Sequence, residues 1–116
     1  MRTYDGSCHC GAVRFRLRCP EITEGLRCNC SICTRKGIVM STRYFAPEEI
    51  EVHGREALKL YQWGDREVNN WLCATCGVYP FHDATRKPGH YRVNLGCIDG
   101  VDTKTLALTL VDGRSF

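Results

Sequence analysis

The sequence has no long hydrophobic run and none of the patterning that marks a multi-part protein. No apolar stretch approaches the roughly 20 residues that a membrane-spanning helix requires, so we expect no transmembrane segment. Residues 1–6 carry no apolar signal region, which predicts a cytoplasmic protein. Internal repeats, low-complexity tracts and linkers are also absent. We therefore expect one domain, residues 1–116, with a single modest core.

Other absences narrow the fold and the chemistry. No stretch holds a helical period over three turns, which argues against a helical bundle. We find no serine–histidine–acid triad, no glycine-rich phosphate loop and no carboxylate pair in a distinctive context. The formal net charge of +3 neither requires nor excludes nucleic acid, and we do not expect it as a partner.

The patterns that are present predict short β-strands. Residues 11–18 alternate strictly, with Val13, Phe15 and Leu17 on one side and arginines on the other, as in a half-buried strand. Further strands are expected at residues 37–41, 50–53, 58–63, 67–72, 78–81, 91–95 and 106–110. Turns or single helical turns are expected at residues 20–25, 28–36 and 46–50. The chain is predicted to be mainly β and mainly antiparallel, with short connections.

Cysteine is abundant, with nine among 116 residues. A secreted disulfide scaffold would fit that share, but the odd count leaves one thiol unpaired. Most of the cysteines are spaced C-x-C or C-x-x-C, where a bridge is strained and a shared metal is favoured. Seven of them form the motifs Cys8-His9-Cys10-Gly11, Cys28-Asn29-Cys30-Ser31-Ile32-Cys33 and Cys73-Ala74-Thr75-Cys76-Gly77. We expect zinc as the cofactor, with two ions per chain.

The number of ligands indicates that the two sites differ. Two closed sulfur sites need eight thiolates, and the motifs supply seven. If the outer motifs share one ion, the middle triplet holds the other with three ligands and an open position, as in reactive zinc sites. Alternatively, Cys19, Cys97 or a histidine closes the second site, and both ions are structural. Spacing alone also permits the triplet to partner the last motif.

The order of the three motifs, with Arg35-Lys36-Gly37 after the second, resembles the family of the glutathione-dependent formaldehyde-activating enzyme, which includes centromere protein V. Residues 93–102 resemble the C-terminal part of that family, and the similarity covers nearly the whole chain. It implies coiled antiparallel sheets of the β-tent type. It also implies a structural zinc on one set of cysteines and a labile or catalytic zinc on another. The first set is Cys8, Cys10, Cys73 and Cys76, and the second is Cys28, Cys30 and Cys33.

The resemblance implies a carbon–sulfur lyase that makes or cleaves a thiol–aldehyde adduct such as S-hydroxymethylglutathione. The expected partners are therefore a small thiol such as glutathione and an aldehyde such as formaldehyde, with no membrane partner. The chain is shorter than the glutathione enzyme proper, so segments that recognise the tripeptide could be missing. Two alternatives stay open: a non-catalytic zinc domain that binds a macromolecule, and a thiol carrier.

A few further residues are candidates for substrate contacts. Arg35 and Lys36 directly follow the triplet and could attract an anionic thiol, and Cys97 sits in a glycine-flanked loop that could line a pocket. Cys19 is more simply a small buried hydrophobe. His82 could be a general base or a ligand, although an ordinary strand histidine is the simpler interpretation.

Overall fold

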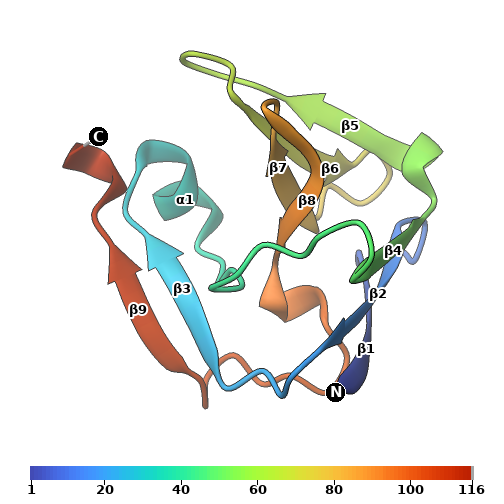
Figure 1. The fold of residues 1–116 in the computed structure, drawn as a ribbon. Coiled ribbons are helices and arrows are strands. Elements are labelled where there is room, and N and C mark those ends of the chain that lie inside the picture. Colours follow the sequence, from blue (N-terminus) through green and yellow to red (C-terminus); the bar gives the residue numbers. More distant parts are fainter. Residues whose placement is uncertain (116) are drawn as a thin grey trace.

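The computed structural model describes residues 1–115, which form three small sheets (Figure 1). One sheet has the strand order β1-β2-β4, a second has β5-β6-β7-β8, and a third pairs β3 with β9. The strands are β1 (Arg2–Ser7), β2 (Arg14–Cys19), β3 (Glu24–Cys28), β4 (Ile50–His53), β5 (Leu58–Tyr61), β6 (Val68–Cys73), β7 (Phe81–Ala84), β8 (Lys87–Val93) and β9 (Ala107–Val111). The predicted mainly β, mainly antiparallel domain is confirmed.

Helical structure is limited to short segments. The helices are α1 (Ser31–Lys36) and the 3-10 turns η1 (Arg55–Ala57), η2 (Leu95–Cys97) and η3 (Gly113–Ser115). Gly37 ends α1 in the left-handed conformation, with φ of 62°, and its N–H donates to the carbonyl of Cys33. None of the helices in the described part of the chain has the length and hydrophobicity needed to cross a bilayer.

The core lies where the three-stranded and four-stranded sheets meet. In β2, Phe15 and Leu17 are buried while the intervening arginines are exposed, as the alternation predicted. The Phe15 ring meets the ring of Phe81 from β7 edge to face, with centroids 6.0 Å apart. The two sheets are therefore joined by aromatic packing.

Several predicted strands are displaced. Residues 37–41 form no strand, and Met40 makes only isolated bridges to Leu26 and Asn94. The strand expected at 78–81 begins at Phe81 instead, because the N–H of Cys73 bonds the carbonyl of Val78 and closes the preceding turn. The turn expected at 20–25 ends early, since β3 starts at Glu24.

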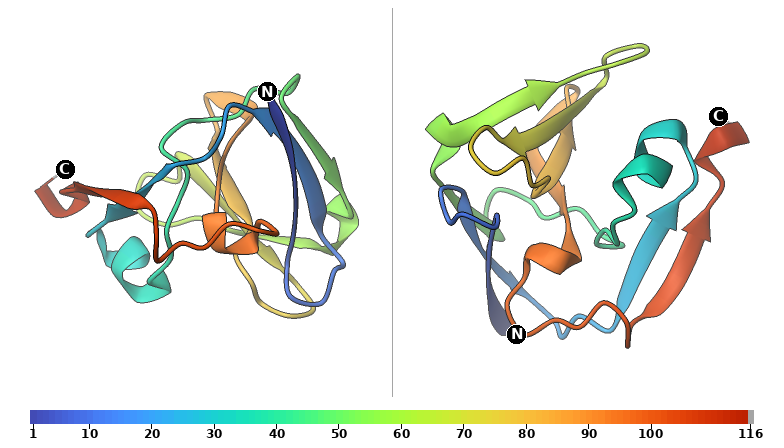
Figure 2. Two further views of the ribbon diagram at one scale, coloured as in Figure 1. Left: turned by 90° about the horizontal axis from the view of Figure 1, so that it is seen from below. Right: turned by 180° about the vertical axis from the view of Figure 1, so that it is seen from behind.

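The β3–β9 pair differs from the rest because it is parallel. Cys28 at the end of β3 lies opposite Val111 at the end of β9, so residues far apart in sequence become neighbours. Figures 1 and 2 show this pair, with α1 beside it, on the side of the molecule away from β5. The segment after α1 crosses between the two sides.

Candidate metal centres

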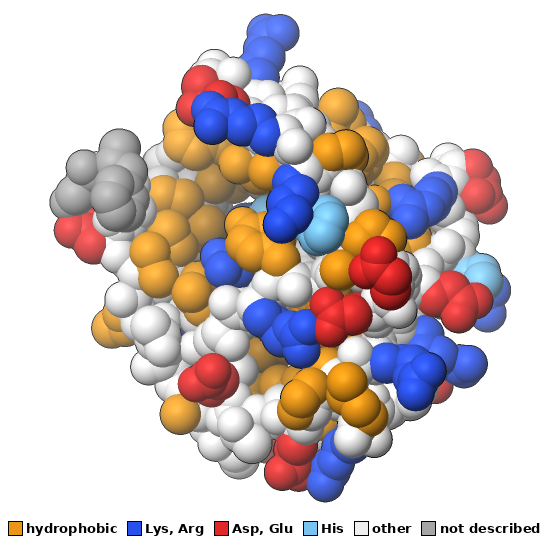
Figure 3. All heavy atoms as spheres, in the orientation of Figure 1, with side chains coloured by type: hydrophobic (Ala, Val, Ile, Leu, Met, Phe, Trp, Pro, Cys, Tyr) orange, Lys and Arg blue, Asp and Glu red, His pale blue; other side chains and the backbone are white. Residues whose placement is uncertain are grey.

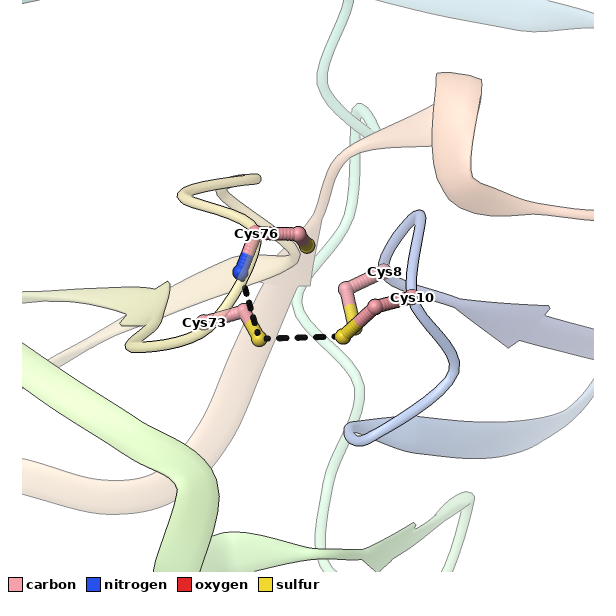
Figure 4. A group of neighbouring side chains, drawn as sticks. All are labelled: Cys8, Cys10, Cys73 and Cys76. Carbon is pink, nitrogen blue, oxygen red and sulfur yellow. Dashed lines mark hydrogen bonds between the residues drawn. The ribbon is translucent and has the colours of Figure 1, made fainter.

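Four cysteine sulfurs gather between the β1–β2 loop and the turn after β6 (Figure 4). All four ligand atoms lie within 4.8 Å of one another. The Sγ of Cys10 is 3.7 Å from that of Cys8 and 3.6 Å from that of Cys73. The remaining member is Cys76. The structure thus brings the two outer motifs together, and the triplet does not join the last motif.

Local backbone geometry aims these sulfurs at one point. Gly11 and Gly77, which follow the two motifs, have φ near +80°, a conformation that residues with a side chain rarely adopt. The N–H of Val13 donates to the Cys8 sulfur at 3.4 Å. Hydrogen bonds from the backbone N–H groups of Val78 and Cys10 lower the pKa of Cys76 to about 6. The Cys76 sulfur is therefore favoured as thiolate, the form of cysteine that binds metal.

A second cluster holds the sulfurs of Cys28, Cys30 and Cys33, also within 4.8 Å of one another and half-buried. Cys28 ends β3, while Cys30 precedes α1 and Cys33 lies in its first turn. Burial and the adjacent Cys30 sulfur raise the pKa of Cys33 to about 12. This thiol therefore keeps its proton at neutral pH unless a metal cation displaces the proton. Soft sulfur donors at this separation fit zinc.

No fourth metal-binding side chain completes the triplet among residues 1–115. Cys19 is buried outside both clusters, as a small hydrophobe would be. Cys97 is also buried, on η2, and its thiol donates to the carbonyl of Tyr79 at 3.9 Å. Burial and the charges of Cys8 and Cys76 raise the pKa of Cys97 to about 11. Neither spare cysteine closes the second site.

The segment after β9 supports the triplet from one side. The Asn29 side chain donates to the carboxylate of Asp112 at 3.0 Å and accepts from the N–H of Arg114 at 2.9 Å. A Cβ atom built on Gly113 would lie 2.4 Å from the Cys28 sulfur. Glycine is therefore required there by close approach and not by an unusual φ.

A cavity of about 200 Å³ opens beside the three sulfurs. Most of its lining is apolar, and none of the lining residues is acidic. The residues around it are Leu26, Cys28, Cys30, Ile32, Cys33, Lys36, Ile38, Met40, Trp63, Val68, Asn70, Tyr79, His82, Arg92 and Val111. Figure 3 shows this side of the molecule, where hydrophobic side chains surround Lys or Arg groups and a histidine. We name this cavity the triplet pocket.

Two cations border the triplet pocket. The Lys36 ammonium lies 3.4 Å from the ring centroid of Tyr79, and the Arg92 guanidinium lies 4.4 Å from that of Tyr44. Burial lowers the pKa of Lys36 although the cysteines oppose this effect. Burial, with Lys36 and Arg92 adding to it, also lowers the pKa of His82 to about 3, so its ring is neutral.

The substrate-contact candidates from the sequence separate in the structure. Lys36 lines the triplet pocket. Arg35 does not: its guanidinium donates to the carbonyl of Ser31 at 2.9 Å, on the exposed face of α1. Cys97 lies outside the pocket as well. The alternation and spacing of the sequence gave no signal for Arg92, and they left His82 undecided, because both lie on strands of a different sheet from Cys28.

Comparison with known proteins agrees with this geometry. The sequence profile of the family described as "Glutathione-dependent formaldehyde-activating enzyme" matches residues 3–109. A Halomonas elongata protein, provisionally named as an enzyme of this kind, is 42% identical over 62 residues. That match covers 50% of this chain but only 39% of the relative.

The fold also has a solved relative. A Rhodobacter sphaeroides crystal structure from structural genomics superposes with a TM-score of 0.75 at 34% sequence identity, covering 90% of this chain and 99% of that one. Since the family profile spans nearly all of the sequence and the cysteine motifs meet as two clusters, the chain belongs to the glutathione-dependent formaldehyde-activating enzyme family.

Proposed function

We propose that this protein is a zinc-dependent carbon–sulfur lyase that forms or cleaves an adduct between a small thiol and an aldehyde. The observation that carries the proposal is the three-cysteine cluster, which has no fourth protein ligand among the described residues and borders the triplet pocket. Glutathione and formaldehyde, the pair in the family's description, are the proposed substrates. The cysteines are free thiols, which persist in a reducing compartment and can then bind metal. This favours a cytoplasmic location.

The two clusters have different proposed roles. Cys8, Cys10, Cys73 and Cys76 would hold a structural zinc that ties the β1–β2 loop to the turn after β6. Cys28, Cys30 and Cys33 would hold the reactive one. When bound there, zinc supplies a position that keeps an incoming thiol deprotonated near neutral pH, although three thiolates already weaken its strength as a Lewis acid.

The residues of the chain supply the rest of the environment. Apolar side chains such as Ile38, Met40 and Val111 exclude water from the reacting groups. Lys36 offsets the negative charge of the three thiolates. In the synthetic direction the substrate sulfur donates an electron pair to the aldehyde carbon, and the carbonyl oxygen takes a proton to become the hydroxyl. In the lyase direction the hydroxyl loses its proton, the C=O bond re-forms, and the carbon–sulfur bond breaks with its electron pair returning to sulfur.

The test compares Cys30→Ala with Cys19→Ala. Both remove a thiol, but Cys19 is buried outside the clusters. For Cys30→Ala we expect loss of one of two zinc ions and a rate of S-hydroxymethylglutathione formation more than about 100-fold lower, since changes merely beside metal ligands already cost about 10–100-fold. Cys19→Ala should keep both ions and the rate. Unchanged turnover in Cys30→Ala would refute the proposal. If the unmodified protein binds glutathione but does not accelerate adduct formation, it is a thiol carrier and the proposal also fails.

A further inference from the structure

The His82 side chain lines the triplet pocket and presents one of its two ring nitrogens to a tyrosine. Its Nδ1 lies 2.9 Å from the hydroxyl of Tyr79, which in turn lies 2.7 Å from Oδ1 of Asn70. All three residues line the pocket. The direction of these hydrogen bonds determines which nitrogen of His82 carries the proton.

The direction can be traced from Asn70. Its Nδ2 donates to the carbonyl of Tyr61 at 3.1 Å, so its Oδ1 is the atom that faces Tyr79. An amide oxygen only accepts, and the tyrosine hydroxyl has a single hydrogen, which must therefore go to Asn70. The Tyr79 oxygen is left to accept from His82, and Nδ1 must carry the hydrogen.

The remaining nitrogen is then a free acceptor. The ring is neutral because burial beside Lys36 and Arg92 disfavours the charged form. With the hydrogen on Nδ1, the Nε2 of His82 carries only a lone pair. Within residues 1–115 no hydrogen bond reaches Nε2, and the one fully buried side-chain nitrogen or oxygen without a partner is Nε of Arg92. Nε2 is therefore not sealed inside the protein.

We propose that Nε2 of His82 accepts a hydrogen bond from the hydroxyl of the thiol–aldehyde adduct, which makes His82 a catalytic residue that orients that hydroxyl. This assignment rests on the proposed function. The other nitrogen-bearing side chains around the pocket are either donors, as Lys36 and Arg92 are, or already paired, as Asn70 is. His82 therefore offers an acceptor for a hydroxyl in this largely apolar cavity. The pocket should therefore bind thiol adducts that carry a hydroxyl more tightly than the corresponding thioethers, which lack it.

Two substitutions separate this role from a structural one. In His82→Gln the side-chain amide reaches the position of Nε2 and offers an acceptor there, whereas in His82→Asn it reaches only the position of Nδ1 and can still donate to Tyr79. We expect His82→Gln to keep kcat for adduct cleavage within about threefold of the parent. His82→Asn should lose about tenfold, the equivalent of one hydrogen bond. The opposite order, with Asn the better replacement, would show that His82 only supports Tyr79 and would overturn the assignment.

A second measurement does not depend on turnover. In the zinc-loaded parent labelled with ¹⁵N-histidine, the ring signals that vanish in His82→Gln belong to His82. We expect Nδ1 to be protonated and Nε2 to be bare at neutral pH. A proton on Nε2 would overturn the assignment even in an active enzyme. If the parent proves inactive, the proposed function fails, and the tautomer still decides whether His82 offers the acceptor.

Discussion

At the residue scale, the proposed zinc site at the triplet depends on close packing as much as on its three cysteines. Gly113 approaches the Cys28 sulfur so closely that a single added carbon would overlap it, at 2.4 Å, and would also lie 3.1 Å from the Cβ of Cys30. The overlap is with ligand-bearing side chains whose backbone is held by β3 and α1. A small change beside the site should therefore move a ligand.

We expect Gly113→Ala to weaken zinc binding at the triplet by about 10–100-fold, because a displaced thiolate loses the geometry that the metal requires. The four-cysteine site should be unaffected. Competition with a colorimetric chelator measures both affinities. Arg114→Ala, an exposed neighbour, is the control and should leave both sites unchanged. Equal zinc affinity in Gly113→Ala and the parent would show that the close approach of Gly113 does not hold the Cys28 sulfur in place.

The cysteine groups could be anticipated from sequence because each motif is local. Thiols two or three positions apart in sequence must lie near one another whatever the fold. The one open question was which motifs come together in space. The pocket wall could not be anticipated in the same way. Arg92 reaches it from β8 and Trp63 from the loop after β5, so their contact with the triplet depends on sheet packing that no short pattern encodes.

At the element scale, β4 was predicted at its observed bounds, residues 50–53. The strand β1 was not predicted, whereas its partner β2 was. The apolar alternation of β2 reports burial directly, whereas β1 is largely polar and becomes a strand through pairing with β2. The parallel contact of β3 with β9 joins segments about 80 residues apart, and sequence patterns do not reveal such pairings. Gly6 of β1 lies opposite Phe15 and leaves room for its ring.

Gly6→Ala should therefore destabilise the fold. The added Cβ would lie 2.3 Å from the Phe15 ring and would push that ring against Phe81. Overpacking of this kind costs about 1–3 kcal/mol of the free energy of unfolding. Urea denaturation of the zinc-loaded protein measures it. Thr3→Ala, at an exposed position of the same strand, should change the free energy by less than about 0.5 kcal/mol. Equal stability of the two variants would contradict this packing.

At the scale of the whole molecule, the two metal centres differ in how deeply they are built into the fold. The four-cysteine cluster joins the three-stranded sheet to the four-stranded one; Cys8 and Cys73 are buried in the core, Cys76 is partly buried and Cys10 is exposed. The triplet sits beside the two-stranded pair, with all three of its cysteines partly exposed. Loss of the first ion should disrupt the domain, whereas loss of the second should not.

Mild chelation should therefore remove one of two zinc ions per chain while the far-ultraviolet circular dichroism stays unchanged. The other ion should leave only as the protein unfolds, because its binding free energy is part of the folding free energy. Metal analysis of the chelated protein, with a circular dichroism spectrum of the same sample, tests both statements. Release of both ions at the same rate would remove the distinction between a structural and a reactive site.

The parallel pairing of β3 with β9 also has a consequence for how the chain matures on the ribosome. All four sulfurs of the first cluster lie at or before residue 76, so that cluster can assemble without the residues that follow it. The triplet is made earlier still, yet Val111 and Gly113, which border it, are added after both cysteine clusters. A growing chain would therefore have all the parts of the four-cysteine site before it has all the parts of the triplet pocket.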